Sequence, residues 1–244
     1  MHATLRTGMS GSIRLYVTAL LHAGCEVDAT PGQAHYLGTV MRRGAGDVVR
    51  LFNGADGEWQ ARITSLRRDR ARLAVETPLR PQAPEPDLWL VFCPLKRDAT
   101  ELVVEKATEL GASALLPVLS QRTNTARLNG ARLLAIATEA AEQCERLTVP
   151  RIAPPRPLAE ALADWPDGRP LVAAMERQNA PPVSPVDEPA ALLVGPEGGF
   201  TGAELDALRS YPFVVPASLG ARILRAETAA IVGLALLQAS SGDE

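Results

Sequence analysis

The sequence predicts two domains: a small β-barrel or sheet, followed by a larger α/β domain with a parallel sheet. Three observations support this fold class. Residues 14–80 contain short β-like runs between turn signals, residues 78–87 carry four prolines in ten positions, and the rest of the chain alternates apolar runs with helical patterns. We therefore expect a flexible leader over residues 1–13, a connector over 81–87 and the second domain over 88–244.

The predicted first domain is made of short strands. Turn signals such as Gly44-Ala-Gly-Asp47 and Asn53-Gly54 separate them, which is typical of a small antiparallel barrel or sheet. The β-like runs are Arg14–Val17, Val48–Phe52, Glu58–Thr64 and Ala71–Val75.

The predicted second domain alternates buried-type strands with helices, which indicates a parallel sheet covered on both faces. Asp98 is a plausible N-cap with Glu101 three residues later, and Gly111 ends that helix. Two more helices are expected at about 129–146 and 227–239. The apolar runs are 88–93, 114–119, 171–174, 190–194 and 213–215.

Composition excludes several classes of protein. The chain has 244 residues, 46% of them hydrophobic, so it is long and apolar enough for a proper core. No run approaches the roughly 18 consecutive apolar residues of a membrane span. Cys25, Cys93 and Cys144 are far apart and accompanied by only three histidines, so we expect reduced thiols, a cytoplasmic location and no metal site.

Charge is distributed unevenly along the chain. The net charge is −3, yet residues 1–80 hold eleven Arg and seven acidic residues, which leaves that segment at +4 and the remainder at −7. A basic segment of this kind is a weak indication of nucleic-acid contact.

A glycine-rich turn is the strongest local feature. In Leu192-Leu-Val-Gly-Pro-Glu-Gly-Gly-Phe-Thr201 an apolar strand runs into glycines and then into a helix capped by Thr201, with Glu204 at the reciprocal position. Such a loop lets backbone N–H groups approach a ligand. It matches neither a P-loop nor GxGxxG. A tight strand-to-helix turn without a ligand is the alternative.

Two further segments carry polar residues in apolar surroundings. In Ser218-Leu-Gly-Ala-Arg-Ile-Leu-Arg-Ala-Glu-Thr-Ala229 two arginines and Glu227 imply a polar ligand or an ion pair, unless this is an ordinary helix start with a solvated arginine. Glu139-Ala-Ala-Glu-Gln-Cys-Glu-Arg146 ends a helix with Gln143, Cys144 and Arg146, and a solvated helix face is the alternative.

These motifs, in this order and spacing, resemble the 16S ribosomal RNA uracil-N3 methyltransferases of the SPOUT class. The resemblance rests on Gly195–Gly199, Leu219–Ala229 and Glu142-Gln-Cys-x-Arg146. His35-Tyr-Leu-x-x-Val-Met-Arg42 is similar to the PUA-like barrel of that family, and Lys96 to Gly111 also matches. The similarity covers roughly residues 14–240. Members usually have Gly where this chain has Glu145.

The resemblance implies a C-terminal trefoil knot whose loops bind S-adenosylmethionine. The cofactor-binding residues that it implies are Leu171, Val172, Gly195, Pro196, Glu197, Gly198, Gly199, Leu219, Gly220, Ile223, Leu224, Arg225 and Thr228. It also implies a homodimer that acts on one uridine, number 1498, of 16S ribosomal RNA, either free or in the 30S subunit.

The implied chemistry requires loss of the proton on uracil N3 as that atom attacks the methyl group. Arg225 is the candidate cation that stabilises the charge developing on O2 and O4, and Glu197 and Glu227 are alternative proton acceptors. The candidate RNA-binding residues are Arg14, Arg42, Arg43, Arg122, Gln143 and Arg146.

Three other functions remain open from the sequence. They are a non-catalytic RNA-binding protein with a purely structural glycine turn, a methyltransferase acting on another RNA nucleotide, and a nucleotide-dependent oxidoreductase. The missing GxGxxG after the strand at 88–93 counts against the oxidoreductase.

Overall fold

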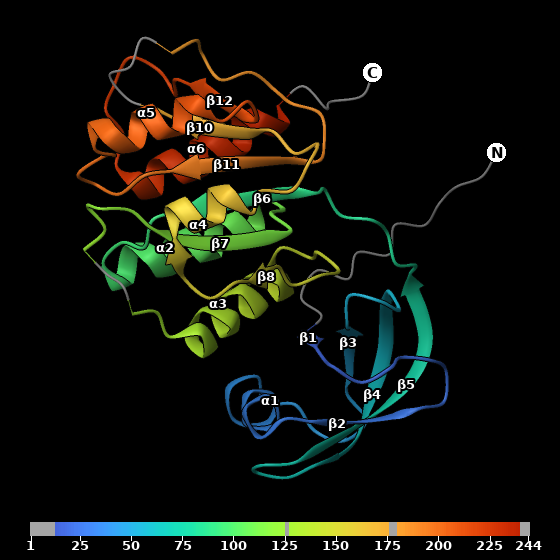
Figure 1. The fold of residues 1–244 in the computed structure, drawn as a ribbon. Coiled ribbons are helices and arrows are strands. Elements are labelled where there is room, and N and C mark those ends of the chain that lie inside the picture. The colour runs from blue at the N-terminus through green and yellow to red at the C-terminus, as the bar shows by residue number, and fades with distance from the viewer. Residues whose placement is uncertain (1–12, 125–126, 176–179, 240–244) are drawn as a thin grey trace, which may run out of the picture. The chain divides into compact units, whose positions relative to one another are not determined.

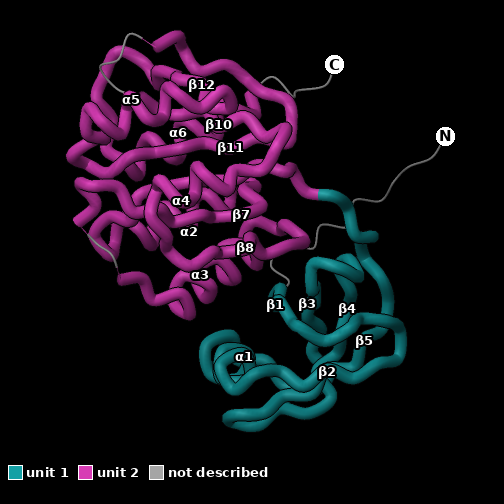
Figure 2. Tube along the Cα trace, in the orientation of Figure 1, with its two compact units in different colours: residues 1–84 teal, residues 85–244 magenta. Residues whose placement is uncertain are grey.

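The chain divides after Pro84 into two units, residues 1–84 and 85–244 (Figure 2). The computed structural model describes residues 13–124, 127–175 and 180–239. The leader predicted for residues 1–13 lies, except for Ile13, outside the described residues. The division falls inside the proline-rich segment 78–87, although strand β5 continues to Arg80.

The first unit is a five-stranded sheet in the order β1-β3-β4-β5-β2. It is mostly antiparallel, but β1 pairs with β3 in parallel, which the prediction of an antiparallel sheet did not include. The side chains that alternate along the strands form one core that contains Leu51, Ile63 and Leu73. Its elements are β1 (Arg14–Tyr16), β2 (Glu26–Ala29), α1 (Pro31–His35), the π-helix η1 (Tyr36–Val40), β3 (Val48–Phe52), β4 (Glu58–Leu66) and β5 (Ala71–Arg80).

The second unit is built on a parallel sheet in the order β12-β10-β11-β6-β7-β8, with β9 paired to β7 (Figure 1). The elements are β6 (Leu88–Phe92), α2 (Arg97–Glu109), β7 (Ala114–Leu119), α3 (Gly130–Gln143), β8 (Arg151–Ile152), β9 (Arg156–Pro157), α4 (Leu158–Ala163), β10 (Leu171–Ala174), β11 (Ala190–Val194), α5 (Gly202–Ser210), β12 (Val214–Ala217) and α6 (Ala226–Gln238).

Both faces of this sheet are covered, as the continuous apolar strands predict. Along β6, Leu90 and Phe92 face the core formed with α2, α3 and α6, whereas Val91 faces the core formed with α4 and α5. Helix α6 lies close to β11 because Gly233 has no side chain: a Cβ there would lie 2.6 Å from Cδ2 of Leu192.

Helix α2 begins one residue earlier than its predicted cap. Lys96 is the N-cap and makes no side-chain cap, while Asp98 lies inside the first turn. The turn is closed by Thr100, whose Oγ1 accepts from the Leu95 amide at 2.9 Å and donates to the Leu95 carbonyl at 3.0 Å. The predicted cap at Asp98 is therefore wrong. Instead, Thr100 inside the helix forms hydrogen bonds with Leu95 in the preceding loop.

Arg14, a predicted RNA contact, is buried in the first unit. Its side chain is 3% exposed, its Nε lies 2.5 Å from Oε1 of Glu58, and its guanidinium stacks on the Phe52 ring at 4.3 Å. Arg80 donates to the same carboxylate at 2.8 Å. Arg14 is therefore buried in an ion pair inside the first unit and is not accessible to RNA. Its assignment as an RNA-binding residue is corrected.

Arg146, also a predicted RNA contact, is buried in the second unit. Its Nη1 donates to the carbonyls of Thr108, at 2.8 Å, and Ala112, at 3.1 Å, which places a cation at the C-terminal end of α2. Its Nη2 lies 3.6 Å from Oε2 of Glu85. Burial lowers the pKa of Arg146. This RNA-binding assignment is corrected for the same reason.

Glu145, the residue before Arg146, has a left-handed backbone. It follows the C-cap Cys144 of α3 and has a φ of +62°, a conformation that favours glycine because a Cβ meets the following carbonyl oxygen. The glycine usual at this position in the resembled family is thereby explained: the chain must turn sharply so that the next side chain can enter the core.

We predict that Glu145→Gly raises the free energy of unfolding by about 1 kcal/mol, because it removes the strain of a side chain at positive φ. Thermal unfolding measures this as a rise in Tm of roughly 2–4 °C. The matched control is Glu139→Gly in the middle of α3, where the same change costs about 1 kcal/mol of helix stability. Equal effects of the two substitutions would contradict the explanation.

We also predict acid sensitivity from Glu58, whose side chain is 1% exposed. Burial raises its pKa, but hydrogen bonds from Arg14 and Arg80 outweigh burial, so the net shift is below the ordinary 4.5. Its stabilising contribution is complete above pH 4.5 and is lost as the pH falls through the lower folded value.

Glu58→Gln therefore lowers the free energy of unfolding by about 3–5 kcal/mol at pH 7, since the buried Arg14 loses the negative charge with which it pairs. The measurement is the urea midpoint of the first unit at pH 7 and at pH 3. The difference from the wild type should shrink at pH 3. Glu76→Gln is the control, because Glu76 also pairs with an arginine but is partly exposed, and a loss as large as that of Glu58→Gln would count against the account.

Candidate functional site

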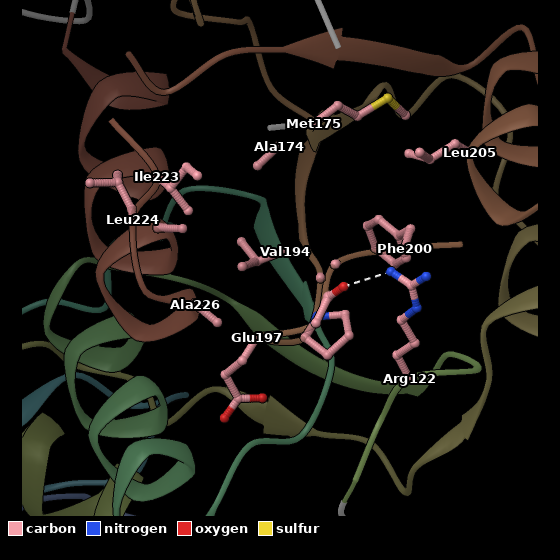
Figure 3. Close-up of a pocket in the computed structure, with 15 residues that line it drawn as sticks. Arg122, Ala174, Met175, Val194, Glu197, Phe200, Leu205, Ile223, Leu224 and Ala226 are labelled. Atoms are coloured by element: carbon pink, nitrogen blue, oxygen red, sulfur yellow. Dashed lines mark hydrogen bonds between the residues drawn. The ribbon is translucent and has the colours of Figure 1, made fainter. Parts of the chain in front are cut away.

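A cavity of about 300 Å³ opens where β10 and β11 end (Figure 3). It lies at the carboxyl edge of the parallel sheet, where ligand sites of α/β folds are usually found. Apolar side chains and the glycine-rich turn at 195–199 both line it. The lining residues are Arg122, Ala174, Met175, Val194, Gly195, Pro196, Glu197, Gly198, Gly199, Phe200, Leu205, Ile223, Leu224, Ala226 and Ala229.

The glycine turn after β11 forms one wall. Gly195 lies against the Phe200 ring so closely that a Cβ on it would be 2.9 Å from Cε2 of Phe200. Gly199 has a φ of +67°, which turns the chain towards α5. The predicted capping box at the start of α5 is confirmed, since Thr201 and Glu204 bond reciprocally.

The loop after β7 holds this turn from the side. Nη1 of Arg122 donates to the carbonyl of Gly198 at 2.8 Å (Figure 3), and the amide of Gln121 donates to Oε1 of Glu204 at 2.7 Å. Two loops that lie far apart in the sequence are therefore joined. Arg122 fixes a backbone carbonyl that otherwise has to be solvated.

The segment that leads into α6 forms the opposite wall. Ile223 and Leu224 contribute side chains, and Ala226 and Ala229 contribute the first turns of the helix. Ile223 is 62% exposed, unusual for so large an apolar side chain. The glycine turn and this C-terminal segment thus share one cavity, as the family resemblance implies.

The structure brings only some of the predicted cofactor-binding residues to this cavity. All five residues of the glycine turn line it, together with Ile223 and Leu224. Leu171 and Val172 do not, because their side chains are buried in the cores on the two faces of β10. Four more are absent from the lining: Leu219, Gly220, Arg225 and Thr228.

Sequence reasoning missed part of the lining. Ala174, the last residue of β10, and Met175, which follows it, reach the cavity. They lie three positions beyond the predicted residues Leu171 and Val172. Five more lining residues were also missed: Val194, Phe200, Leu205, Ala226 and Ala229. The available signal was position: in a parallel sheet the residues at the strand's carboxyl end, not those at its beginning, face the ligand edge.

Of the three predicted catalytic residues, Glu197 is among the residues that line the cavity, whereas Arg225 and Glu227 are only neighbours in sequence of lining residues. Arg225 is the exposed N-cap of α6, between the lining residues Leu224 and Ala226, and Glu227 is half-buried in the first turn. Glu197 is exposed on the glycine turn, with its carboxylate pointing away from Val194 and Ile223 (Figure 3).

The remaining predicted RNA contacts are accessible. Arg122 and Gln143 are exposed in the second unit, and Arg42 is exposed in the first, where its φ is +52°. Arg43 is half-buried. Within the described residues no group of three or more His, Cys, Asp or Glu side chains is placed to hold a metal ion. None of the helices in that part of the chain is long and apolar enough to cross a membrane.

Comparison with known proteins gives two family matches. Residues 82–238 match an RNA methyltransferase domain, and residues 30–76 match an RNA methyltransferase PUA domain. Ribosomal RNA small subunit methyltransferase E of Rickettsia conorii is 32% identical over 91% of this chain and 93% of its own length. The protein of the same name in Synechocystis is 33% identical over 87% of this chain and 73% of its own.

Solved structures share the same fold. One is a ribosomal RNA small subunit methyltransferase E from Neisseria gonorrhoeae, bound to S-adenosylmethionine. It superposes with a TM-score of 0.84 at 30% identity, and the match covers 93% of this chain and 97% of the other chain. A protein of Legionella pneumophila with the same bound cofactor gives a TM-score of 0.84 at 28% identity, over 94% of this chain and 98% of its own.

Proposed function

Because the chain belongs to the ribosomal RNA small subunit methyltransferase E family, we propose that it transfers the methyl group of S-adenosylmethionine to N3 of one uridine in 16S ribosomal RNA. The more general activity is S-adenosylmethionine-dependent methylation of small-subunit ribosomal RNA. It follows from family membership together with the similar solved structure that contains the bound cofactor. The single observation in the chain itself that supports it most is the cavity shared by residues 195–199 and 223–229.

The residues around the cavity fit this cofactor. Ile223, Leu224 and Phe200 supply apolar surface for an adenine ring, and the glycines leave backbone amides and carbonyls accessible to polar atoms. When bound, the cofactor supplies an electrophilic methyl group on sulfur. The chain's own contribution is to position it and to exclude water from the apolar side.

The residues proposed to act on the uracil ring line the cavity or are close in sequence to the residues that line it. For the new N3–methyl bond to form, the N3–H bond of uracil and the methyl–sulfur bond would both have to break, which would leave a neutral thioether, and the negative charge of the ring would spread to O2 and O4. Arg225 is the cation proposed to stabilise that charge, because it is the exposed N-cap residue of α6 and stands in the sequence between two lining residues, Leu224 and Ala226. Glu197 and Glu227 remain alternative acceptors of the N3 proton.

The RNA is proposed to contact arginines of both units, namely Arg42, Arg43 and Arg122, together with Gln143. All are exposed or half-buried in their own unit. We also propose a homodimer, a C-terminal trefoil knot and a cytoplasmic location. The proposal of the knot comes from the family resemblance. In the structure the segment after residue 180 pairs with the loop at Ser218, since Val183 N donates to Ser218 O and Ser218 N donates to Pro181 O.

Incubation with methyl-labelled S-adenosylmethionine and undermethylated small ribosomal subunits tests this function. Mass spectrometry of nuclease digests should place the label on a single uridine of 16S ribosomal RNA. Arg225→Ala should lower kcat by about 10²-fold or more, since a preorganised cation acts on the transition state. Arg209→Ala, on the exposed face of α5, is the control.

Label on cytosine, guanine or protein would sink the uracil assignment. Absence of both transfer and calorimetric heat with S-adenosylmethionine would instead favour a non-catalytic RNA-binding protein. Wild-type kcat in Arg225→Ala would remove that residue from the mechanism while leaving the reaction intact.

A further inference from the structure

A second cavity, of about 310 Å³, lies between the start of α2 and the start of α3. Its floor is apolar: Leu95 and Leu133 are buried and Leu128 is half-buried. Its other lining residues are polar, namely Arg97, Thr100, Glu101, Arg127, Asn129 and Arg132. An apolar floor beside several arginines matches a ligand with a flat or sugar-like body and an anionic group.

The charges around this cavity are predominantly positive, with three arginines and one glutamate in the lining. Oε1 of Glu101 accepts from Nε of Arg97 at 3.0 Å, and Oε2 accepts from Nη2 of Arg132 at 3.0 Å. The hydrogen bonds from Arg132 and Arg97 lower the pKa of Glu101, so it stays ionised and orients both guanidinium groups. Each guanidinium has five N–H donors, which leaves several for a phosphate.

Arg127 carries the third positive charge. It is exposed, and it has no acidic partner within 4 Å among the residues that the structure describes. The helices α2 and α3 both begin at this cavity, with Lys96 and Asn129 as their N-caps. The positive ends of two helix dipoles therefore add to the arginines.

The position of this cavity relates it to the cofactor pocket. Strand β6 leads to Leu95 and Arg97, and its neighbour β11 leads to the glycine turn, so both cavities open at the carboxyl edge of one sheet. The loop after β7 contributes to both, since Arg122 lines the cofactor pocket and Arg127 lines the second cavity.

We propose that the second cavity binds a nucleotide of the substrate RNA close to the methylated one, with its phosphate on Arg97, Arg127 and Arg132. This inference rests on the proposed function, because an RNA substrate at the cofactor pocket is what brings a sugar–phosphate chain to this edge. The apolar floor takes the ribose or the base. Glu101 holds the Arg97 and Arg132 guanidinium groups on its two carboxylate oxygens, so both lie at the same side of the cavity.

The test is binding of unmodified, in vitro transcribed 16S ribosomal RNA across a range of salt concentrations. Arg127→Gln should weaken binding about 5-fold or more and reduce the slope of log Kd against log salt concentration by about 1, as loss of one phosphate contact requires. Arg97→Gln with Arg127→Gln should reduce it by about 2. With undermethylated subunits, KM should rise and kcat should change little.

The control is Lys106→Gln, at the opposite end of α2. This change removes one positive charge that, like Arg97, pairs with carboxylates but lies away from the cavity. Calorimetry with S-adenosylmethionine should give the same Kd for all variants, which separates this inference from the proposed function. If wild-type protein transfers no methyl group, the proposed function fails, while the salt slopes still decide whether the cavity holds RNA.

Three results would overturn the proposal. One is a salt slope for Arg127→Gln that equals that of Lys106→Gln. Another is binding of free uridine 5′-monophosphate as tight as that of the transcript, which would make the cavity a site for a free nucleotide. The third is a change of oligomeric state in the variants on size-exclusion chromatography with unchanged RNA affinity, which would make it an interface between copies.

Discussion

The contact between the Gly195 backbone and the Phe200 ring governs the path of the chain after β11. The ring occupies the space that a side chain at position 195 would need, since a Cβ would lie 2.9 Å from it. This packing lets the strand turn within five residues and start α5, whose cap at Thr201 is closed by Glu204. Because the turn is held in this way, its backbone faces the C-terminal segment across a cavity rather than collapsing onto it.

Buried arginines stabilise the scaffold on which this cavity is built. Arg146 joins the end of α3 to the end of α2, and Arg169 stacks on Trp89 at 3.8 Å while donating to the carbonyls of Asp87 and Ala190. Such groups are costly to bury, and here backbone carbonyls and a carboxylate accept hydrogen bonds from them. Both arginines bind carbonyl groups at the amino ends of parallel strands, Ala112 before β7 and Asp87 and Ala190 at the starts of β6 and β11, whereas the exposed Arg122 lies at the carboxyl edge.

Much of the second unit was predictable, because strands buried on both faces leave uninterrupted apolar runs such as Ala114–Leu119 and Ala190–Val194, whose observed bounds equal the predicted ones. Strand β2 was missed because in Glu26–Ala29 only Val27 is fully buried. The burial of Arg14 was not predictable, since Glu58 lies 44 residues away and nothing local links the two. The glycine turn was found from composition, but the lining residue Met175 depends on where β10 ends, and residues 176–179 that follow lie outside the described part.

The glycine turn and the segment at 223–229 are proposed to enclose the methyl donor. Calorimetric titration of S-adenosylmethionine into Gly195→Ala and Gly198→Ala, with thermal unfolding recorded for both, measures this. A Cβ at Gly198 would meet the Arg122 side chain at an ordinary 3.5 Å, so that variant should bind like the wild type, whereas Gly195→Ala must displace Phe200 and should lose at least about 10-fold in affinity. Wild-type affinity in a folded Gly195→Ala protein would contradict the account.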